Sequence, residues 1–229
     1  MEITKKEFIN INNKFDEYKI KEEKAFEYIE GKEKIIVSAP HSVRQIRNGN
    51  IKGKDSCTGT IAILLQKQLN CYCLYKTKNC NDDANYDIEN NPYKDKIIDL
   101  VEKNNINCNT NEKNNINFLL DIHGAKDGQG FDIDVGTANL KNLNGQNKYL
   151  KDFIKIGEKY NLNITIDKVF KADTLHTVAN TIARKTKIPC MQIEIAKKYR
   201  DIEQFNNIKI MLNFLGEYLR NILVGGQNE

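Results

Sequence analysis

The sequence predicts a single α/β domain built as a three-layer α/β/α sandwich around a mixed, mostly parallel sheet. Segments typical of strands alternate with segments typical of amphipathic helices along the 229 residues. Several strand segments are continuous apolar runs, which are typical of strands buried on both faces of a parallel sheet. No stretch rich in Pro, Gly and Ser divides the chain, so residues 1–229 are predicted to share one core.

In the first half of the chain, hydrophobic periodicity indicates strands and helices of ordinary length. Residues 25–30 and 34–39 flank a turn that contains Gly31 and are predicted to pair as a hairpin. Apolar residues recur at helical spacing over residues 58–69. The remaining elements are a strand over residues 71–76 and a helix that begins at Pro92, because proline suits a first helical turn.

The second half continues the alternation and ends in a long helix. Residues 189–195 alternate between polar and apolar side chains, so Gln192 and Glu194 are predicted to share one face of a strand. Three more strands are predicted over residues 116–122, 131–135 and 163–167. Helices are predicted over residues 148–160, 174–185 and 202–223.

Composition excludes several classes of protein. Hydrophobic residues are 40% and charged residues 29% of the chain, with a net charge of +4, which is ordinary for a globular protein. The 35 basic residues are interspersed with 31 acidic ones, so we expect no nucleic acid partner. No apolar run approaches the roughly 20 residues of a membrane span, and the start lacks the apolar core of a signal peptide. We therefore expect a cytoplasmic protein whose six cysteines are reduced; the oligomeric state stays open.

Polar side chains stand at the ends of three predicted strands. His41 and His123 each follow an apolar run, and Glu194 lies within the alternating strand near its end. In open α/β sheets, ligands bind beyond the carboxyl ends of the strands. Because the chain has only three histidines, two of them at strand ends favour a shared site over two separate structural roles.

These residue types suit a catalytic zinc ion. Such a site takes three protein ligands and keeps an open position for water. His41 and His123 supply two ligands, and the third is a carboxylate or His176. Asp55 is the best carboxylate candidate, although it also stands where it could cap the following helix. Asp121 lies two residues before His123 on the same predicted face, from which it could orient that ligand.

Glu194 has two interpretations. It is either the general base that takes a proton from water, or a buried carboxylate paired with Arg200 or Lys197. Arginine suits the recognition of a substrate carboxylate or an oxyanion, and Arg47 and Arg200 flank the proposed site segments. His176 is predicted to lie inside a helix as a pocket or packing residue.

Six short motifs, in their order along residues 35–200, resemble the N-formylglutamate amidohydrolase family. None is specific alone, and the shared order and spacing carry the resemblance. They are Val37-Ser38-Ala39-Pro40-His41-Ser42, Lys54-x3-Thr58-Gly59, Asp82-Asp83-Ala84-Asn85-Tyr86-Asp87, Asn91-Pro92-Tyr93-Lys94, Asp121-Ile122-His123-Gly124 and Gln192-Ile193-Glu194-Ile195 with Arg200.

The resemblance implies a fold like that of zinc carboxypeptidases and metal-dependent hydrolysis of an amide bond. It implies one zinc ion on His41, Asp55 and His123, with Glu194 as the base. It also implies a substrate contact at Asn85. The family has an arginine where this chain has Tyr86, so the formylglutamate substrate itself stays open.

The predicted function is therefore a zinc-dependent amidohydrolase that cleaves a small N-acyl amino acid or a short peptide. Substrate-binding residues are predicted at Arg47, Asn85, His176 and Arg200. The alternatives are a zinc carboxypeptidase-like peptidase and a non-catalytic module that binds small molecules on the same scaffold. A metal-free serine or thiol hydrolase is disfavoured, because the chain has no Gly-x-Ser-x-Gly elbow.

Overall fold

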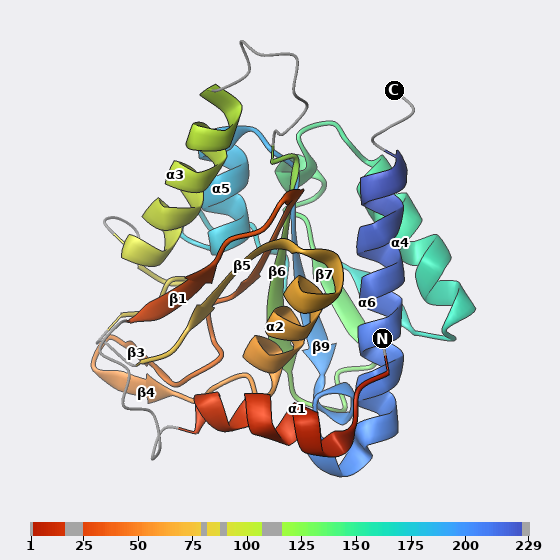
Figure 1. Ribbon diagram of the computed structural model, residues 1–229. Coiled ribbons are helices and arrows are strands. Elements are labelled where there is room, and N and C mark those ends of the chain that lie inside the picture. Colours follow the sequence, from red (N-terminus) through yellow and green to blue (C-terminus); the bar gives the residue numbers. More distant parts are fainter. Residues whose placement is uncertain (1, 17–24, 79–81, 88–90, 107–115, 226–229) are drawn as a thin grey trace.

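A seven-stranded mixed sheet runs through the protein, with helices on both of its faces (Figure 1). In the computed structural model, the described residues are 2–16, 25–78, 82–87, 91–106 and 116–225. The sheet has the order β1-β5-β2-β6-β9-β7-β8. Its strands are β1 (Phe26–Ile29), β2 (Glu33–Ala39), β5 (Cys71–Lys76), β6 (Phe118–Ala125), β7 (Ile133–Gly136), β8 (Ile164–Ile166) and β9 (Cys190–Ala196).

The four central strands β5, β2, β6 and β9 are parallel, whereas the outer strands include antiparallel pairs. β1 runs antiparallel to β5, and β7 runs antiparallel to β9. A separate two-stranded hairpin consists of β3 (Gln45–Arg47) and β4 (Asn50–Lys52). The predicted mixed, mostly parallel sheet is confirmed.

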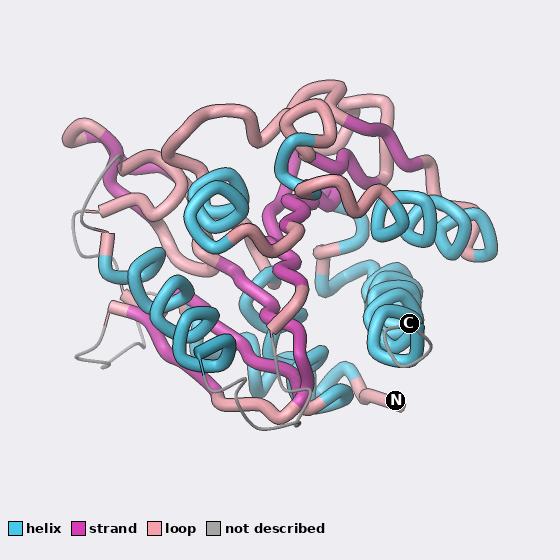
Figure 2. Tube along the Cα trace, turned by 90° about the horizontal axis from the view of Figure 1, so that it is seen from above, coloured by secondary structure: helices cyan, strands magenta, loops and turns pink. Residues whose placement is uncertain are grey.

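Helices cover the sheet in two layers, which Figure 2 shows from above. α2 (Thr58–Leu69), α4 (Lys148–Lys159) and α6 (Phe205–Gly225) pack on one face, and α1 (Lys5–Asn12) packs beside α2. α3 (Pro92–Ile106) and α5 (Val178–Thr186) pack on the other face. Short 3₁₀ helices span Asn13–Phe15, Lys141–Leu143, Lys197–Tyr199 and Ile202–Gln204. The three-layer sandwich is therefore confirmed.

The two faces of the sheet differ in chemistry. The face toward α2, α4 and α6 is apolar along the central strands, as Val37 on β2 and Ile193 on β9 illustrate. On the opposite face, apolar side chains such as Leu119 contact α3 and α5 near the beginning of the strands. Toward the carboxyl ends, that face becomes polar, and this change places the functional site.

The predicted hairpin between residues 25–30 and 34–39 is wrong. β5 lies between β1 and β2, and the N–H groups of Lys32 and Glu33 donate to the carbonyl of Asn70. A Cβ atom at Gly31 would lie 2.3 Å from the backbone of Cys71. All six residues of β5 are buried, so this strand belongs in the interior, and half-buried β1 takes the edge.

Two element boundaries also differ from the prediction. β6 continues to Ala125, so His123 lies within the strand rather than after it. α5 begins at Val178, because the Thr177 side chain caps it by accepting from the N–H of Asn180. The predicted helix over 174–185 is therefore wrong at its start, and His176 lies in the preceding turn.

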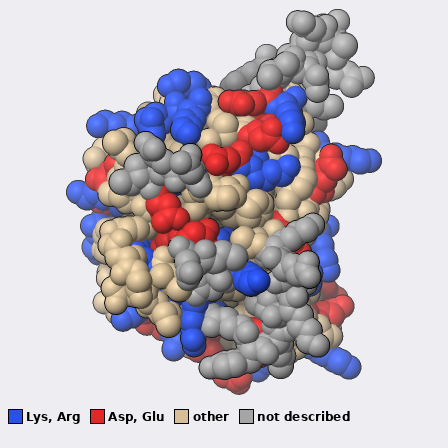
Figure 3. Space-filling model, turned by 90° about the vertical axis from the view of Figure 1, so that its left-hand side faces the viewer, with Lys and Arg blue, Asp and Glu red and all other residues tan. Residues whose placement is uncertain are grey.

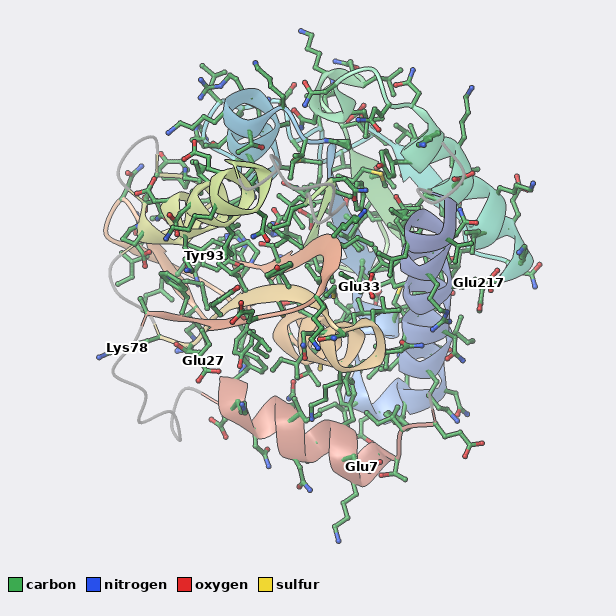
Figure 4. The ribbon with its side chains drawn as sticks, turned by 45° about the horizontal axis from the view of Figure 1, so that its top comes forward. Glu7, Glu27, Glu33, Lys78, Tyr93 and Glu217 are labelled. Carbon is green, nitrogen blue, oxygen red and sulfur yellow. The ribbon has the colours of Figure 1, made fainter. Side chains whose placement is uncertain are left out.

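Tyr93 joins α3 to the sheet at the base of the site (labelled in Figure 4). Its buried hydroxyl group contacts the Ser38 hydroxyl at 2.9 Å, accepts from the N–H of Ala39 and donates to the carbonyl of Leu74. These bonds fix the last residues of β2, from which the chain enters the site. On the far side of the sheet, Glu217 of α6 pairs with Lys159 of α4.

The first described residues contribute to the apolar core. Phe8 of α1 packs edge-on against Phe205, and Phe15 packs in the same way against Tyr75. On the surface in Figure 3, acidic and basic side chains are interspersed. Across the described residues, no helix combines the length and apolar character needed to cross a bilayer.

Candidate active site

The polar ends of three parallel strands form the floor of the candidate site. Ser38 of β2 pairs in register with Asp121 of β6, and Asp121 pairs with Gln192 of β9. Two residues further along, His123 pairs with Glu194. All five side chains are buried, and they share the sheet face that α3 and α5 cover at its other end. Because parallel strands end at one edge, the sheet itself assembles this cluster.

Three potential ligand atoms converge above this floor. The His41 Nδ1 atom lies 3.1 Å from His123 Nδ1 and 3.3 Å from Asp55 Oδ2, and the last two atoms are 3.4 Å apart. His41 follows β2, and Asp55 stands before α2. The Asp55 N–H group donates to the His41 carbonyl at 2.8 Å, which holds the two loops together.

The spacing of these atoms suits a divalent metal ion. A tetrahedral zinc site with bonds of about 2.0–2.2 Å places its ligand atoms roughly 3.3 Å apart. The observed separations of 3.1–3.4 Å match that value. Among the described residues, His41, Asp55 and His123 form the cluster of histidine and carboxylate side chains whose ligand atoms are close enough to share a metal ion. Two nitrogen ligands and one carboxylate are the donor types that catalytic zinc uses.

Each histidine has a carboxylate behind it. His41 Nε2 lies 2.8 Å from Asp83 Oδ1, and His123 Nε2 lies 3.0 Å from Asp121 Oδ2. When each Nε2–H donates to its carboxylate, each Nδ1 lone pair faces the centre of the site. The prediction that Asp121 orients His123 is consistent with this contact, whereas the matching role of Asp83 was missed. Nothing in the sequence indicates which histidine Asp83 meets.

Hydrogen bonds among these side chains shift the pKa values of two of them. Burial disfavours ionisation of Asp55, but bonds to His123 and His41 hold its pKa well below the usual range. Burial likewise disfavours the charged imidazole of His123, but Asp121 and Asp55 raise its pKa to about 10. Metal binding would replace the proton on that imidazole, as ligation of histidine requires. Asp55 does not cap α2, whose N-cap residue is Cys57.

Glu194 lies beside this centre as a poorly solvated carboxylate. Burial raises its pKa to about 7, with a smaller contribution from the Asp55 charge. Gln192 donates to its Oε1 atom at 3.0 Å. Among the described residues, no ion pair joins Glu194 to Arg200 or Lys197, so the structural interpretation from the sequence has no contact to support it. A base with a pKa near 7 is well matched to proton transfer at neutral pH.

Arg47 supports the His41 side of the site. Its guanidinium donates from Nε and Nη2 to Asp83 Oδ2, at 3.0 and 2.7 Å. The same guanidinium lies 4.6 Å from the centre of the Tyr86 ring. Burial opposes ionisation of Asp83, but His41 and Arg47 hold its pKa well below the usual range. Arg47 therefore reaches the cavity while two of its N–H groups are already bonded.

Arg200 is buried and bonded to the backbone. Its guanidinium donates to the carbonyls of Ile195, Ser56 and Ala125 at 2.8–2.9 Å. A Cβ atom at Gly124 would lie 2.1 Å from the Arg200 Cζ atom. Glycine after His123 therefore makes room for the guanidinium. These bonds tie the strand ends to the loop before α2.

Asn85 and His176 form the opposite wall. The Asn85 side chain donates to Gln192 at 3.4 Å and accepts from the N–H of Val178 at 2.7 Å. It thus connects the first turn of α5 to β9. The His176 ring packs edge-on against Tyr86, with 5.5 Å between ring centres.

One cavity of about 920 Å³ joins all eight residues predicted for the site. Its lining is rich in positive charge. The acidic residues of the lining are Asp55, Asp173 and Glu194, and the basic ones are Arg47, Lys52, Lys54, Lys126, Lys171, Lys197 and Arg200. An anionic ligand is favoured in such a cavity.

Comparisons with known proteins give the fold but no sequence family. No family model and no curated protein matches the chain. A gene product of Agrobacterium tumefaciens is similar in structure, with a TM-score of 0.64 and 12% identity over 94% of this chain and 99% of its own. An N-formylglutamate amidohydrolase from Ralstonia eutropha JMP134 has a TM-score of 0.62 and 10% identity over 86% and 98%. A bacteriophage poly-gamma-glutamate hydrolase has a TM-score of 0.56 and 12% identity over 88% and 91%.

The chain shares its fold with these proteins. The structural resemblance to an N-formylglutamate amidohydrolase, expected from the six motifs, is therefore confirmed at the level of the fold.

Proposed function

We propose that this protein is a metal-dependent amidohydrolase that cleaves the acyl–nitrogen bond of a small N-acyl amino acid. The observation that carries the proposal is the convergence of His41, Asp55 and His123 beside a buried carboxylate, Glu194, at the bottom of an open cavity. The names of two proteins with the same fold, an amidohydrolase and a poly-gamma-glutamate hydrolase, support the same reaction class.

His41, Asp55 and His123 would hold one zinc ion, with Asp83 and Asp121 keeping the two imidazole rings in place. A zinc ion there would supply Lewis-acid chemistry, since it lowers the pKa of a water molecule toward about 7 and withdraws electron density from a carbonyl. The cavity of about 920 Å³ that these three residues line has room for water and a small substrate.

Glu194 moves the proton in both halves of the reaction. Its carboxylate takes a proton from water as the water oxygen bonds to the carbonyl carbon, and the carbonyl electron pair moves onto its oxygen. When the C=O bond reforms, the C–N bond breaks, and Glu194 returns the proton to the leaving nitrogen. The products are a carboxylic acid and an amine. Burial favours the protonated form of this carboxyl group, which suits a residue that first accepts a proton and then returns it.

The charge of the cavity favours a substrate with a free carboxylate. An N-acyl amino acid carries one beside the scissile amide, and the excess of basic side chains in the lining suits it. Both named hydrolases of this fold are described by acidic, glutamate-derived substrates. Asn85, His176 and the partly exposed side chain of Arg47 line the walls where such a substrate would be oriented.

A single assay panel tests the proposal. The protein is loaded with Zn²⁺, its metal content is measured, and it is incubated with N-formyl and N-acetyl amino acids, γ-glutamyl peptides and α-peptides. We expect release of formate or acetate by the wild type, none by Glu194→Gln, and wild-type rates for Glu158→Gln, which makes the same change on exposed α4.

The remaining outcomes separate the alternatives. Release of carboxy-terminal amino acids from α-peptides alone would replace the proposal with a peptidase. Zinc-loaded wild type with no turnover on the whole panel would favour a module that only binds small molecules.

A further inference from the structure

A lysine ammonium group lies among the candidate metal ligands. Lys52 is the last residue of β4, and its Nζ atom lies 2.7 Å from His41 Nδ1 and 3.9 Å from Asp55 Oδ1. Its side chain is one-third exposed, so it reaches into the site from the rim of the cavity. The sequence patterns assign no role to this residue.

The direction of this contact has a chemical consequence. His41 Nε2 faces Asp83, so Nδ1 carries the ring's single available lone pair. An ammonium group can only donate, so Lys52 donates to that lone pair, which His123 Nδ1 also approaches at 3.1 Å. A metal ion bound to His41 Nδ1 would need the same lone pair. The ammonium group and the metal ion therefore cannot both occupy it.

The other cations near the metal ligands already have partners. Arg47 is bonded to Asp83, and Arg200 is bonded to three backbone carbonyls. Lys54 donates to the carbonyl of Phe15 at 2.6 Å. Lys126, Lys171 and Lys197 are exposed at the mouth of the cavity. Within the described part of the chain, Lys52 is the lysine or arginine of the lining that contacts a ligand atom of the centre.

We propose that Lys52 has two positions. In the first position its ammonium group donates to the His41 lone pair and competes with the metal ion for it. When the ion binds, the ammonium group moves aside by rotation of its flexible four-carbon stem and faces the carbonyl oxygen of the substrate. There it stabilises the negative charge that develops on that oxygen as water adds to the carbon. This second position rests on the proposed function, and the first does not.

Zinc affinity measured without substrate tests the first position. Competition with a chromophoric chelator gives the Kd of Zn²⁺ for wild type, Lys52→Met and Lys126→Met. We expect Lys52→Met to bind Zn²⁺ about tenfold more tightly, since no charge-assisted hydrogen bond has to be broken first. Lys126→Met removes the same charge from the same cavity without touching His41, so its Kd should stay within about twofold of wild type.

Unchanged or weaker Zn²⁺ binding by Lys52→Met would overturn the competition. Absence of Zn²⁺ binding in all three proteins would overturn it together with the metal site. Lys52→Gln, which keeps a polar end group, repeats the measurement if the methionine variant does not fold.

Turnover at saturating Zn²⁺ tests the second position. We expect kcat of Lys52→Met to fall about 100-fold while KM changes little, and Lys52→Arg to restore part of the loss. Tighter Zn²⁺ binding together with slower turnover is a combination that a purely structural role would not produce. Wild-type kcat in Lys52→Met would overturn the oxyanion role. If no variant and no wild type hydrolyses the panel, but Lys52→Met still binds Zn²⁺ more tightly, the proposed function fails and the competition stands.

Discussion

Two buried carboxylates lie at matching positions on neighbouring strands and have opposite surroundings. Asp134 of β7 pairs in register with Glu194 of β9. Asp134 accepts from the Thr165 hydroxyl and from the three backbone N–H groups of residues 168–170. Among the described residues, Glu194 has one donor, Gln192.

The number of donors separates a structural carboxylate from a reactive one. The four hydrogen bonds to Asp134 offset the free-energy cost of removing its carboxylate from water. They also fix the loop in which Phe170 contributes to the cavity wall. Glu194 lacks that compensation, so burial raises its pKa to about 7. Two acidic residues of similar burial can therefore have different roles, and the four predictions below test that difference.

The largest effect is expected at Glu194. Glu194→Gln removes the group that accepts and returns the proton, so kcat should fall by about 10³-fold. The bound zinc content should stay at the wild-type level, because Glu194 is not among the three converging ligands. Full activity would show that the poorly solvated carboxylate has no part in the reaction.

Asp83 is another buried carboxylate. Like Asp134 it has several hydrogen-bond donors, and like Glu194 it lies beside the candidate metal ligands. It accepts from Arg47, the N–H of Asn85 and His41. Asp83→Asn should weaken zinc binding by about 10–100-fold, since the carboxylate behind His41 is lost. Isothermal titration with Zn²⁺ measures this effect. An unchanged Kd would mean that ring orientation at His41 does not depend on Asp83.

Asp134→Asn should affect folding. Its amide group would bring N–H atoms toward backbone N–H donors, so the free energy of unfolding should fall by about 1.5–3 kcal/mol. Urea denaturation of the metal-free protein measures the change, with Asp152→Asn as the control, because this half-buried residue of α4 accepts one side-chain hydrogen bond, from Asn221. A loss no larger than that of the control would contradict the structural role of Asp134.

The remaining effect is a pH dependence of stability. In the unfolded chain Glu194 titrates near 4.5, whereas in the folded protein its pKa is about 7. Between these values the unfolded chain loses the proton first, so wild-type stability falls as the pH rises from about 4.5 to 7. Glu194→Gln removes this contribution, and the Tm difference between variant and wild type should grow by several degrees over that range and then level off. A constant difference from pH 5 to 8 would show that the pKa of Glu194 is ordinary.

The fold was predictable because it depends on patterns that are local in the sequence. The alternation along β9 correctly indicated a polar face with Gln192 and Glu194 and an apolar face with Ile193. The incorrect hairpin came from proximity in the chain, since sequence spacing cannot show that β5 inserts between β1 and β2. The pairing of β5 with both β1 and β2 joins segments that are distant in the sequence.

Partnerships between distant side chains were beyond prediction for the same reason. The sequence indicated that His41, Asp55 and His123 could be metal ligands. Only the fold shows that their ligand atoms lie close together. The Asp83 contact to His41 spans 42 residues, and no periodicity encodes it. Lys52 was indistinguishable from the other lysines of a lysine-rich chain.

The backbone bond between the Asp55 N–H group and the His41 carbonyl closes the loop that holds β3 and β4 at its base. The tip of that loop is exposed, and Asn48 and Gly49 adopt positive φ angles suited to a tight hairpin turn. Ligand geometry is thus set at the base, while the tip can change in length or composition without moving the ligands. We expect the turn at Asn48 and Gly49 to be exchangeable, so that evolution or design could alter the rim of the cavity there while Arg47 and Lys52 keep their contacts to the centre.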